Sequence, residues 1–361
     1  MSPRVRLVVA LVAAVAGVYV FGYWVAQQNA PSDVRLFTQA LYVGIAATGL
    51  NILTGYNGQV SIGHGAFFGL GAYTSAILVS EHGWNFVPTI PVAMALCFVV
   101  GALIGFPALR VKGLYLALVT LGLAVLFPDL TDRFVNGTGG TNLVTLRGAE
   151  VAVPDWYVWF PDPIADFFDE WVGAQDQWAY YLTLVLALVL LLGVFLIARS
   201  RFGRSLIAVR DHEAAAETVG IDLARVKVTA FALSALYAGT AGSLSVLVNR
   251  LANAGKVETF QLSIEFLVAV VVGGAATVFG PMLGAFIVVF LRDRIDNQDS
   301  LSDLFSDPNR AKLLSPALFG IALIILMYVL PDGIVGGSRR LVRRLGRRSR
   351  RAPAPASPLT S

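Results

Sequence analysis

The sequence predicts an all-α polytopic membrane protein with about ten transmembrane crossings, some of them through helices broken by glycine. Hydrophobic residues make up 56% of the 361 residues and charged residues only 14%, whereas soluble domains carry about a quarter charged residues. The apolar runs are also long, since a hydrocarbon layer of about 30 Å needs roughly 20 apolar residues per helix. The expected spans are Leu7–Ala26, Leu36–Leu53, Gly65–Ser80, Pro88–Leu109, Leu114–Leu126, Tyr180–Ala198, Val228–Val248 and Leu313–Leu330.

One further apolar stretch, Ile264–Leu291, is long for one helix and short for two. Its middle contains Gly273, Gly274, Gly280 and Pro281, a composition that breaks helices. We therefore expect two short spans here, which makes the number of crossings even. We expect the first apolar run to be an uncleaved helix rather than a secretory signal, because no small-residue cleavage site follows it.

The distribution of Lys and Arg predicts the orientation, because these residues gather on the cytoplasmic side. Residues 339–351 hold eight Arg and no acid, Arg4 and Arg6 precede the first span, and residues 199–227 hold six basic residues. The 131–178 loop carries eight acidic and two basic residues, so we expect it outside and both termini inside. We divide the chain into a membrane domain, 1–338, and a basic, then Pro/Ala-rich tail, 339–361. The basic tail favours contact with anionic membrane lipid, not nucleic acid.

Residues 199–227 form a polar interruption between two apolar runs. The segment is rich in Ala and charge, and Gly220 stands where a helix end needs a left-handed residue. We expect a short helix–turn–helix at the membrane surface. A protein that is pushed from the cytoplasm by another protein would need such a device.

Two glycine-rich breaks are candidates for a translocation path. The first, Thr54–Phe67, ends in a Gly-Ala-Phe triplet at 65–67, and the second, Gly273–Pro281, is followed by one at 284–286. Unwound backbone at membrane depth is tolerated where it lines a cavity or is buried in protein. An internal pseudo-symmetry and a chance similarity remain open as explanations of the paired triplets.

The polar residues near these breaks are small or neutral. We interpret Asn57, Gln59, Ser61 and His64 as lining a path for a polar solute, although His64 alone fits a structural hydrogen bond. Thr120, Thr240 and Ser243 fit either the path or helix packing. The Asn136–Asn142 segment, with Thr138, Gly139, Gly140 and Asn142, either presents N–H groups to an anion or is a flexible loop.

The residues argue against an enzyme and against a metal or other cofactor. The three His are far apart, no phosphate-binding loop is present, and we find no nucleophile with a base at suitable spacing. Ion-coupled carriers keep carboxylates inside the membrane. Asp129 is the only weak candidate we identify, which argues against such a carrier.

Several segments form a series of motifs along the chain, namely Tyr56–Tyr73, Gly113–Leu121, Thr138–Asn142, Ala215–Ile221, Lys227–Phe231, Ala238–Gly242, Gly273–Ala285 and Pro331–Ile334. Together they resemble the LivM-type permeases of the branched-chain amino acid ABC importers, in which these motifs occur in the same order. The resemblance covers about residues 36–336.

This resemblance implies a bacterial inner-membrane permease subunit. Its partners would be a second, similar permease, two cytoplasmic ATP-binding subunits and a periplasmic solute-binding protein. The polar interruption would then be the coupling loop, although Ala214 stands where many importers have Glu. The implied coupling residues are Arg210, Asp211, Glu213, Ala215, Ala216, Glu217, Gly220 and Ile221.

The cargo stays open at this point. The same architecture serves branched-chain amino acids and also urea and short amides, and an ion-coupled secondary carrier is a further alternative. An essential intramembrane carboxylate would favour the carrier, whereas association with an ATPase would favour the importer.

Overall fold

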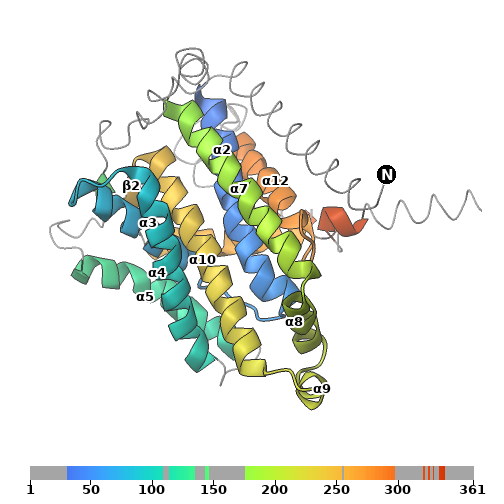
Figure 1. The fold of residues 1–361 in the computed structure, drawn as a ribbon. Helices are drawn as coiled ribbons and strands as arrows, with labels where there is room; N and C mark the ends of the chain where they lie inside the picture. The colour runs from blue at the N-terminus through green and yellow to red at the C-terminus, as the bar shows by residue number, and fades with distance from the viewer. Residues whose placement is uncertain are drawn as a thin grey trace, which may run out of the picture.

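The computed structural model describes residues 31–108, 114–134, 143–145, 175–253 and 256–296, and also residues 320, 321, 324, 325, 328 and 333–337. The described chain is a helical bundle, as predicted, with one short antiparallel strand pair (Figure 1). The elements are α2 (Pro31–Asn51), the π-helical turn η1 (Ile52–Tyr56), α3 (His64–Ser80), α4 (Phe86–Ala108), α5 (Leu114–Phe134), β1 (Leu143–Thr145), α7 (Gln175–Arg199), α8 (Arg201–Asp211), α9 (Glu213–Thr218), α10 (Leu223–Asn249), β2 (Leu251–Asn253), α11 (Lys256–Gly273) and α12 (Gly280–Asp296).

Four described helices are long and apolar enough to cross a membrane. They cover Asp33–Tyr56, Phe86–Pro107, Asp176–Arg199 and Leu223–Asn249, and two shorter apolar helices cover Tyr115–Thr131 and Thr259–Gly273. The predicted span Leu7–Ala26 and most of Leu313–Leu330 lie outside the described residues. The total of ten crossings therefore stays a prediction.

Burial separates the centre of the bundle from its rim. The most apolar windows of α2 and α10 are each 83% buried, whereas those of α4 and α7 are 28% and 33% buried. The exposed residues of α4 and α7 include Leu103, Phe106, Val189 and Leu196. Such apolar faces suit contact with lipid, while α10 packs against α2, α3 and α4 in the core.

Small residues let these core helices approach closely. A Cβ at Gly242 of α10 would lie 1.8 Å from the carbonyl oxygen of Phe68 in α3, and one at Gly239 would lie 2.3 Å from the sulfur of Cys97 in α4. Membrane helices pack through such small residues because hydrocarbon gives no hydrophobic drive for their association.

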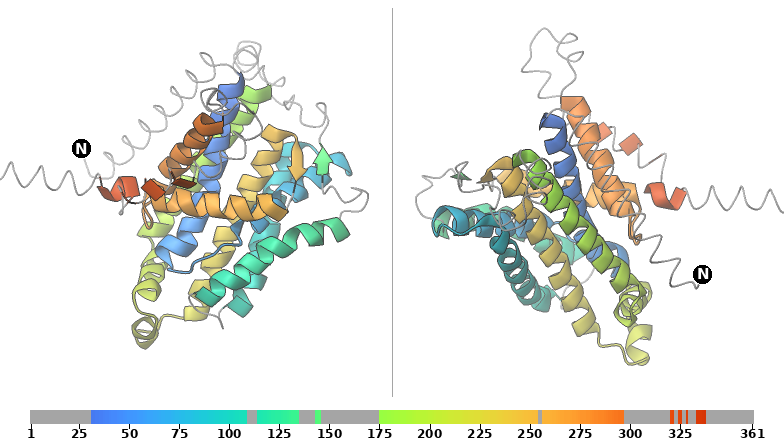
Figure 2. Two further views of the ribbon diagram at one scale, coloured as in Figure 1. Left: turned by 180° about the vertical axis from the view of Figure 1, so that it is seen from behind. Right: turned by 45° about the horizontal axis from the view of Figure 1, so that its top comes forward.

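The predicted break within the apolar stretch Ile264–Leu291 is confirmed. Helix α11 ends at Gly273 and α12 begins at Gly280, although α11 starts at Lys256, eight residues before the predicted Ile264. In the left view of Figure 2, α11 runs across the direction of α2 and α10, whereas α12 runs beside α2. The break thus separates two helices of very different direction.

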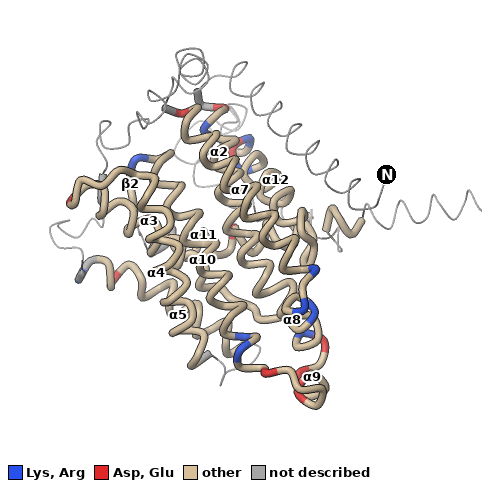
Figure 3. The backbone as a smooth tube through the Cα atoms, in the orientation of Figure 1, with Lys and Arg blue, Asp and Glu red and all other residues tan. Residues whose placement is uncertain are grey.

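Charged residues gather at the two ends of the bundle (Figure 3). One end carries α8 and α9, and the other carries the first turns of α2 and α7, where Arg35 pairs with Asp176 at 3.1 Å. The tube between these ends is mostly free of charged residues. This pattern is that of a chain whose middle lies in hydrocarbon.

Candidate functional site

Helices α8 and α9 form the helix–turn–helix that the polar interruption predicts. The Ser200 hydroxyl accepts a hydrogen bond from the Gly203 N–H at 3.1 Å and so caps α8. The imidazole Nδ1 of His212 accepts from the Ala215 N–H at 3.2 Å and caps α9. Residue 212 therefore ends one helix and begins the next.

Gly220 closes α9 in the predicted left-handed conformation, with φ +84°. The Ile221 N–H donates to the Ala216 carbonyl at 3.1 Å, and the Gly220 N–H donates to the Glu217 carbonyl at 3.0 Å. These two bonds form a Schellman motif, which satisfies the last carbonyls of a helix. The chain then turns directly into α10, whose first turn is capped by Asp222.

An ion pair joins α9 to α10. Lys227 Nζ lies 2.6 Å from Glu213 Oε1, and the Lys227 side chain is only 7% exposed. Ala216 is buried too, whereas Ala215 and Glu217 face solvent and Val219 is 76% exposed. The helix pair is thus held on one face and free on the other.

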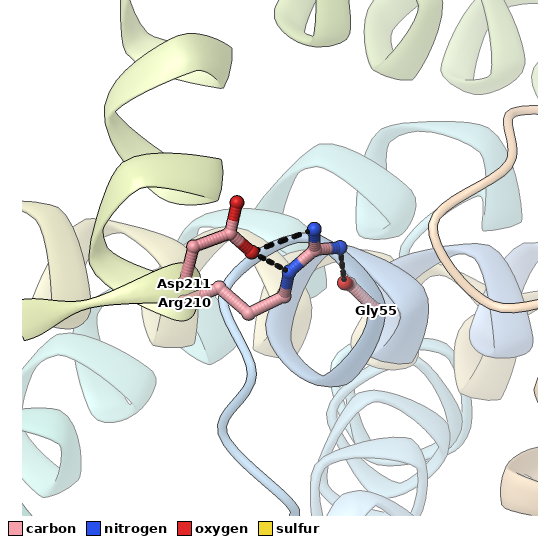
Figure 4. Close-up of polar contacts among 3 residues, drawn as sticks. All are labelled: Gly55, Arg210 and Asp211. Carbon is pink, nitrogen blue, oxygen red and sulfur yellow. Dashed lines mark hydrogen bonds and ion pairs between the residues drawn. The ribbon is translucent and has the colours of Figure 1, made fainter.

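Arg210 joins α8 to the first glycine-rich break (Figure 4). Its guanidinium donates from Nη1 to the carbonyl oxygen of Gly55 at 3.0 Å, and from Nε and Nη2 to Asp211 Oδ1 at 3.0 and 2.9 Å. Gly58, with φ +74°, packs against the same side chain, since a Cβ there would lie 2.7 Å from Arg210 Cγ. Asp211 orients the guanidinium, and Gly55 receives it.

The first break begins in η1, where the helix widens before it ends. The Gln59 N–H donates to the Leu53 carbonyl at 3.0 Å, and the Thr54 hydroxyl donates to the Gln59 carbonyl at 3.1 Å. The Asn57 side chain is 3% exposed, and neither its Nδ2 nor its Oδ1 has a hydrogen-bond partner within the described chain. The same holds for Gln59 Oε1. Buried amides without partners are uncommon and call for an explanation.

The rest of this break is packed between helices. Thr120 accepts a hydrogen bond from the Ile62 N–H and donates one to the Ala117 carbonyl, both at 3.0 Å. His64 Nε2 lies 3.0 Å from the Ala46 carbonyl, and its Nδ1 lies 3.4 Å from the Ser234 hydroxyl. Ser61 is buried beside them. These contacts give His64 and Thr120 structural roles.

The second break is fixed by Asn51, a residue that the sequence analysis did not single out. Its Nδ2 donates to the Thr277 carbonyl at 2.8 Å, and its Oδ1 accepts from the Ala276 N–H at 2.8 Å. Thr277 in turn caps α12 by accepting from the Gly280 N–H at 3.1 Å. Asn51 is the last residue of α2, so one helix end positions both breaks. A lone Asn in an apolar run was the only signal available.

The prediction that Asp129 is the only candidate carboxylate at membrane depth is wrong. Glu265, in the middle of α11, is 4% exposed and bonds Arg292 of α12 at 2.8 Å. Asp129 borders an open apolar groove along α4 and α5. Glu265 was missed because the sequence does not show where its partner lies.

Some predicted site residues lie outside the described residues, namely Thr138, Gly139, Gly140 and Asn142. Thr240 and Ser243 are described, and both bond within the helix core, Thr240 to the Leu236 carbonyl and Ser243 to the Ser75 hydroxyl. Among the described residues, no three His, Cys, Asp or Glu gather as a metal site would require.

An apolar bundle with two interrupted helices and a charged helix pair at one end defines a multi-pass helical membrane protein. The chain belongs to the family described as branched-chain amino acid transport system/permease component, which matches residues 33–330.

The relatives of this chain are transport permeases. It is 32% identical over 324 residues to the high-affinity branched-chain amino acid transport system permease protein LivM of Escherichia coli, covering 85% of this chain and 70% of that protein. It is 23% identical over 329 residues to LivH of the same organism, covering 83% and 96%. It is 26% identical over 246 residues to a probable LivM of Methanocaldococcus jannaschii, covering 67% and 66%. No solved structure matches the chain.

Proposed function

We propose that this chain is the transmembrane permease subunit of an ATP-driven importer for branched-chain amino acids. Family membership supports the class of protein. The similarity to both LivM and LivH of one organism supports a translocation path built from this chain and a second, homologous permease. Two ATP-binding subunits in the cytoplasm and a solute-binding protein in the periplasm complete the proposed complex.

The observation that carries this proposal is the hydrogen bond from Arg210 to Gly55. It connects the exposed helix pair α8–α9 with the interrupted end of α2. We assign α8 and α9 as the coupling helices, with the exposed Val219 as the contact to an ATP-binding subunit. A displacement of α9 reaches α10 through Glu213 and Lys227 and reaches η1 through Arg210. Small rigid-body shifts of this kind alternate the open side of transporters.

The buried amide of Asn57 and the buried side-chain oxygen of Gln59 support the first break as part of the path. They lie beside Gly55 in the sequence, and they have no partners within the described chain. Neutral amides can bind a polar solute and release it again without trapping it by charge. In this proposal, solute binding and the motion driven by the ATPase involve the same short segment.

The remaining parts of the proposal follow from charge and composition. The basic residues of 199–227 and 339–351 favour a cytoplasmic helix pair and C-terminus, and Arg4 and Arg6 favour a cytoplasmic N-terminus, for a protein of the bacterial inner membrane. ATP hydrolysis takes place in the partner subunits, and this chain needs no metal or cofactor of its own. Lipid covers the exposed faces of α4 and α7.

The test is the ATPase activity of the purified complex in lipid, with the loaded binding protein added. Stimulation by leucine, isoleucine or valine is the expected result. Stimulation by urea or a short amide alone would support the ATP-driven importer but contradict the proposed substrate. A purified chain that captures no ATP-binding subunit would contradict the importer proposal.

A further inference from the structure

A charge pair lies inside the helical bundle, away from the coupling helices. Arg292 Nη1 of α12 lies 2.8 Å from Glu265 Oε2 of α11. The Glu265 side chain is 4% exposed, whereas that of Arg292 is 36% exposed. The Glu265 side chain is therefore almost fully buried, whereas the Arg292 side chain is partly exposed.

The contacts of α12 with α2 place this pair along the bundle. The two helices are antiparallel, because residue numbers along α2 decrease as those of their contact partners in and just before α12 increase. These contacts join Asn51 with Thr277, Gly44 with Met282, and Phe37 with Phe286 and Phe290. Arg292 therefore lies near the end of the bundle opposite α8 and α9. On the proposed topology this end faces the periplasm.

Charges inside a membrane protein are costly and mark functional positions. A buried ion pair is weak evidence for stability, because desolvation of both ions offsets their attraction. An apolar pair would hold α11 against α12 equally well. The presence of two opposite charges between α11 and α12 therefore points to recognition of a charged solute.

We propose that Glu265 and Arg292 recognise a zwitterionic α-amino acid as it enters the path. The guanidinium of Arg292 binds the α-carboxylate in the bidentate manner typical of arginine, and Glu265 binds the α-ammonium. The charges of Glu265 and Arg292 sum to zero when no solute is bound. A zwitterion has no net charge, so the net charge of the site is also zero when the solute is bound. An uncharged molecule such as urea cannot replace the attraction between the Glu265 carboxylate and the Arg292 guanidinium when it separates them. This inference rests on the proposed function and narrows its cargo to zwitterions.

The deciding variant is the double substitution E265Q/R292Q, which removes both charges and leaves no buried ion unpaired. We expect the complex to assemble with wild-type basal ATPase activity. Uptake of radiolabelled leucine into proteoliposomes should fall at least about tenfold, since hydrogen bonds to charged groups are lost. The matched control is R35Q/D176N, which neutralises the exposed pair between α2 and α7 and should leave uptake unchanged.

A second variant covers the case in which the double substitution does not assemble. Glu265→Asp keeps both charges and shortens one side chain, and we expect it to raise the KM for leucine with unchanged basal ATPase activity. Leucine uptake at the wild-type level in either variant would overturn the role of Glu265 and Arg292 but not the proposed function. A wild-type complex that takes up urea but no leucine would overturn the proposed cargo and this inference with it.

Discussion

Arg210 and Gly55 are 155 residues apart in the chain, and the guanidinium of the first donates to the carbonyl of the second at 3.0 Å. The carbonyl belongs to η1, where the regular hydrogen bonding of α2 is loosened. A π-helical turn of this kind often lies at a functional position. The contact therefore joins the exposed end of α8 to the π-helical turn that follows α2.

Removing the hydrogen bond between Arg210 and Gly55 should uncouple the helix pair α8–α9 from η1. We expect Arg210→Ala to reduce uptake about tenfold or more, since a hydrogen bond to a charged group contributes about 1.5–3 kcal/mol. ATPase activity of the assembled complex should persist but lose its stimulation by solute. Arg225→Ala is the control, because Arg225 is 88% exposed and pairs only locally with Asp222. Equal effects of the two substitutions would contradict the role of Arg210.

Gly58 offers a test of the packing beneath Arg210. Gly58→Ala meets a left-handed backbone, φ +74°, and also the Arg210 side chain at 2.7 Å. Gly83→Ala meets a left-handed backbone, φ +65°, but no atom within 4 Å. Each should lower the free energy of unfolding in mixed micelles by about 1 kcal/mol for the conformation alone. Only Gly58→Ala should also impair solute-stimulated ATPase activity.

The Glu213–Lys227 pair predicts a non-additive result. Glu213→Gln leaves the ammonium of Lys227 buried, at 7% exposure, without its ion partner. We expect a loss of about 2 kcal/mol, less than for a fully enclosed pair, because Glu213 is one-third exposed. Adding Lys227→Met should recover most of the loss. Thermal unfolding of the two singles and the double measures the coupling, and additive losses would mean that the pair does not act as a unit.

Two asparagines near the breaks should respond in opposite ways. Asn51→Ala removes two hydrogen bonds to the second break and should cost about 2 kcal/mol of stability. Asn57→Ala removes a buried amide that has no partner in the described chain, so its stability should change little. We expect Asn57→Ala nevertheless to alter the KM for solute uptake. Wild-type transport by Asn57→Ala would remove that residue from the proposed path.

Much of the helical order could be predicted from the sequence. Long apolar runs are decided by local composition, and so are ends such as Gly220, where a left-handed residue satisfies the last carbonyls of α9. The break at Gly273–Gly280 follows from the same local chemistry. These features need no knowledge of the rest of the chain.

Contacts between distant segments could not be predicted in this way. Asn51 looks like an ordinary polar residue in an apolar run until α12 brings Thr277 beside it. Glu265 looks like an isolated acid until Arg292 pairs with it. The pairing of β1 with β2, which the all-α prediction omitted, depends likewise on two segments more than a hundred residues apart. Such pairs arise from tertiary packing, to which a single sequence gives no direct access.

Helix α10 is a single uninterrupted helix that runs along the bundle. It begins right after the Gly220 turn, and its 27 residues reach about 40 Å at 1.5 Å per residue. It ends at Asn249, and Arg250 caps it just before strand β2, which is paired with β1. A displacement of its first turn would therefore be carried along one continuous helix to the strand pair at its far end. The helices proposed to meet the ATP-binding subunits and the opposite end of the bundle are thus joined by a single element.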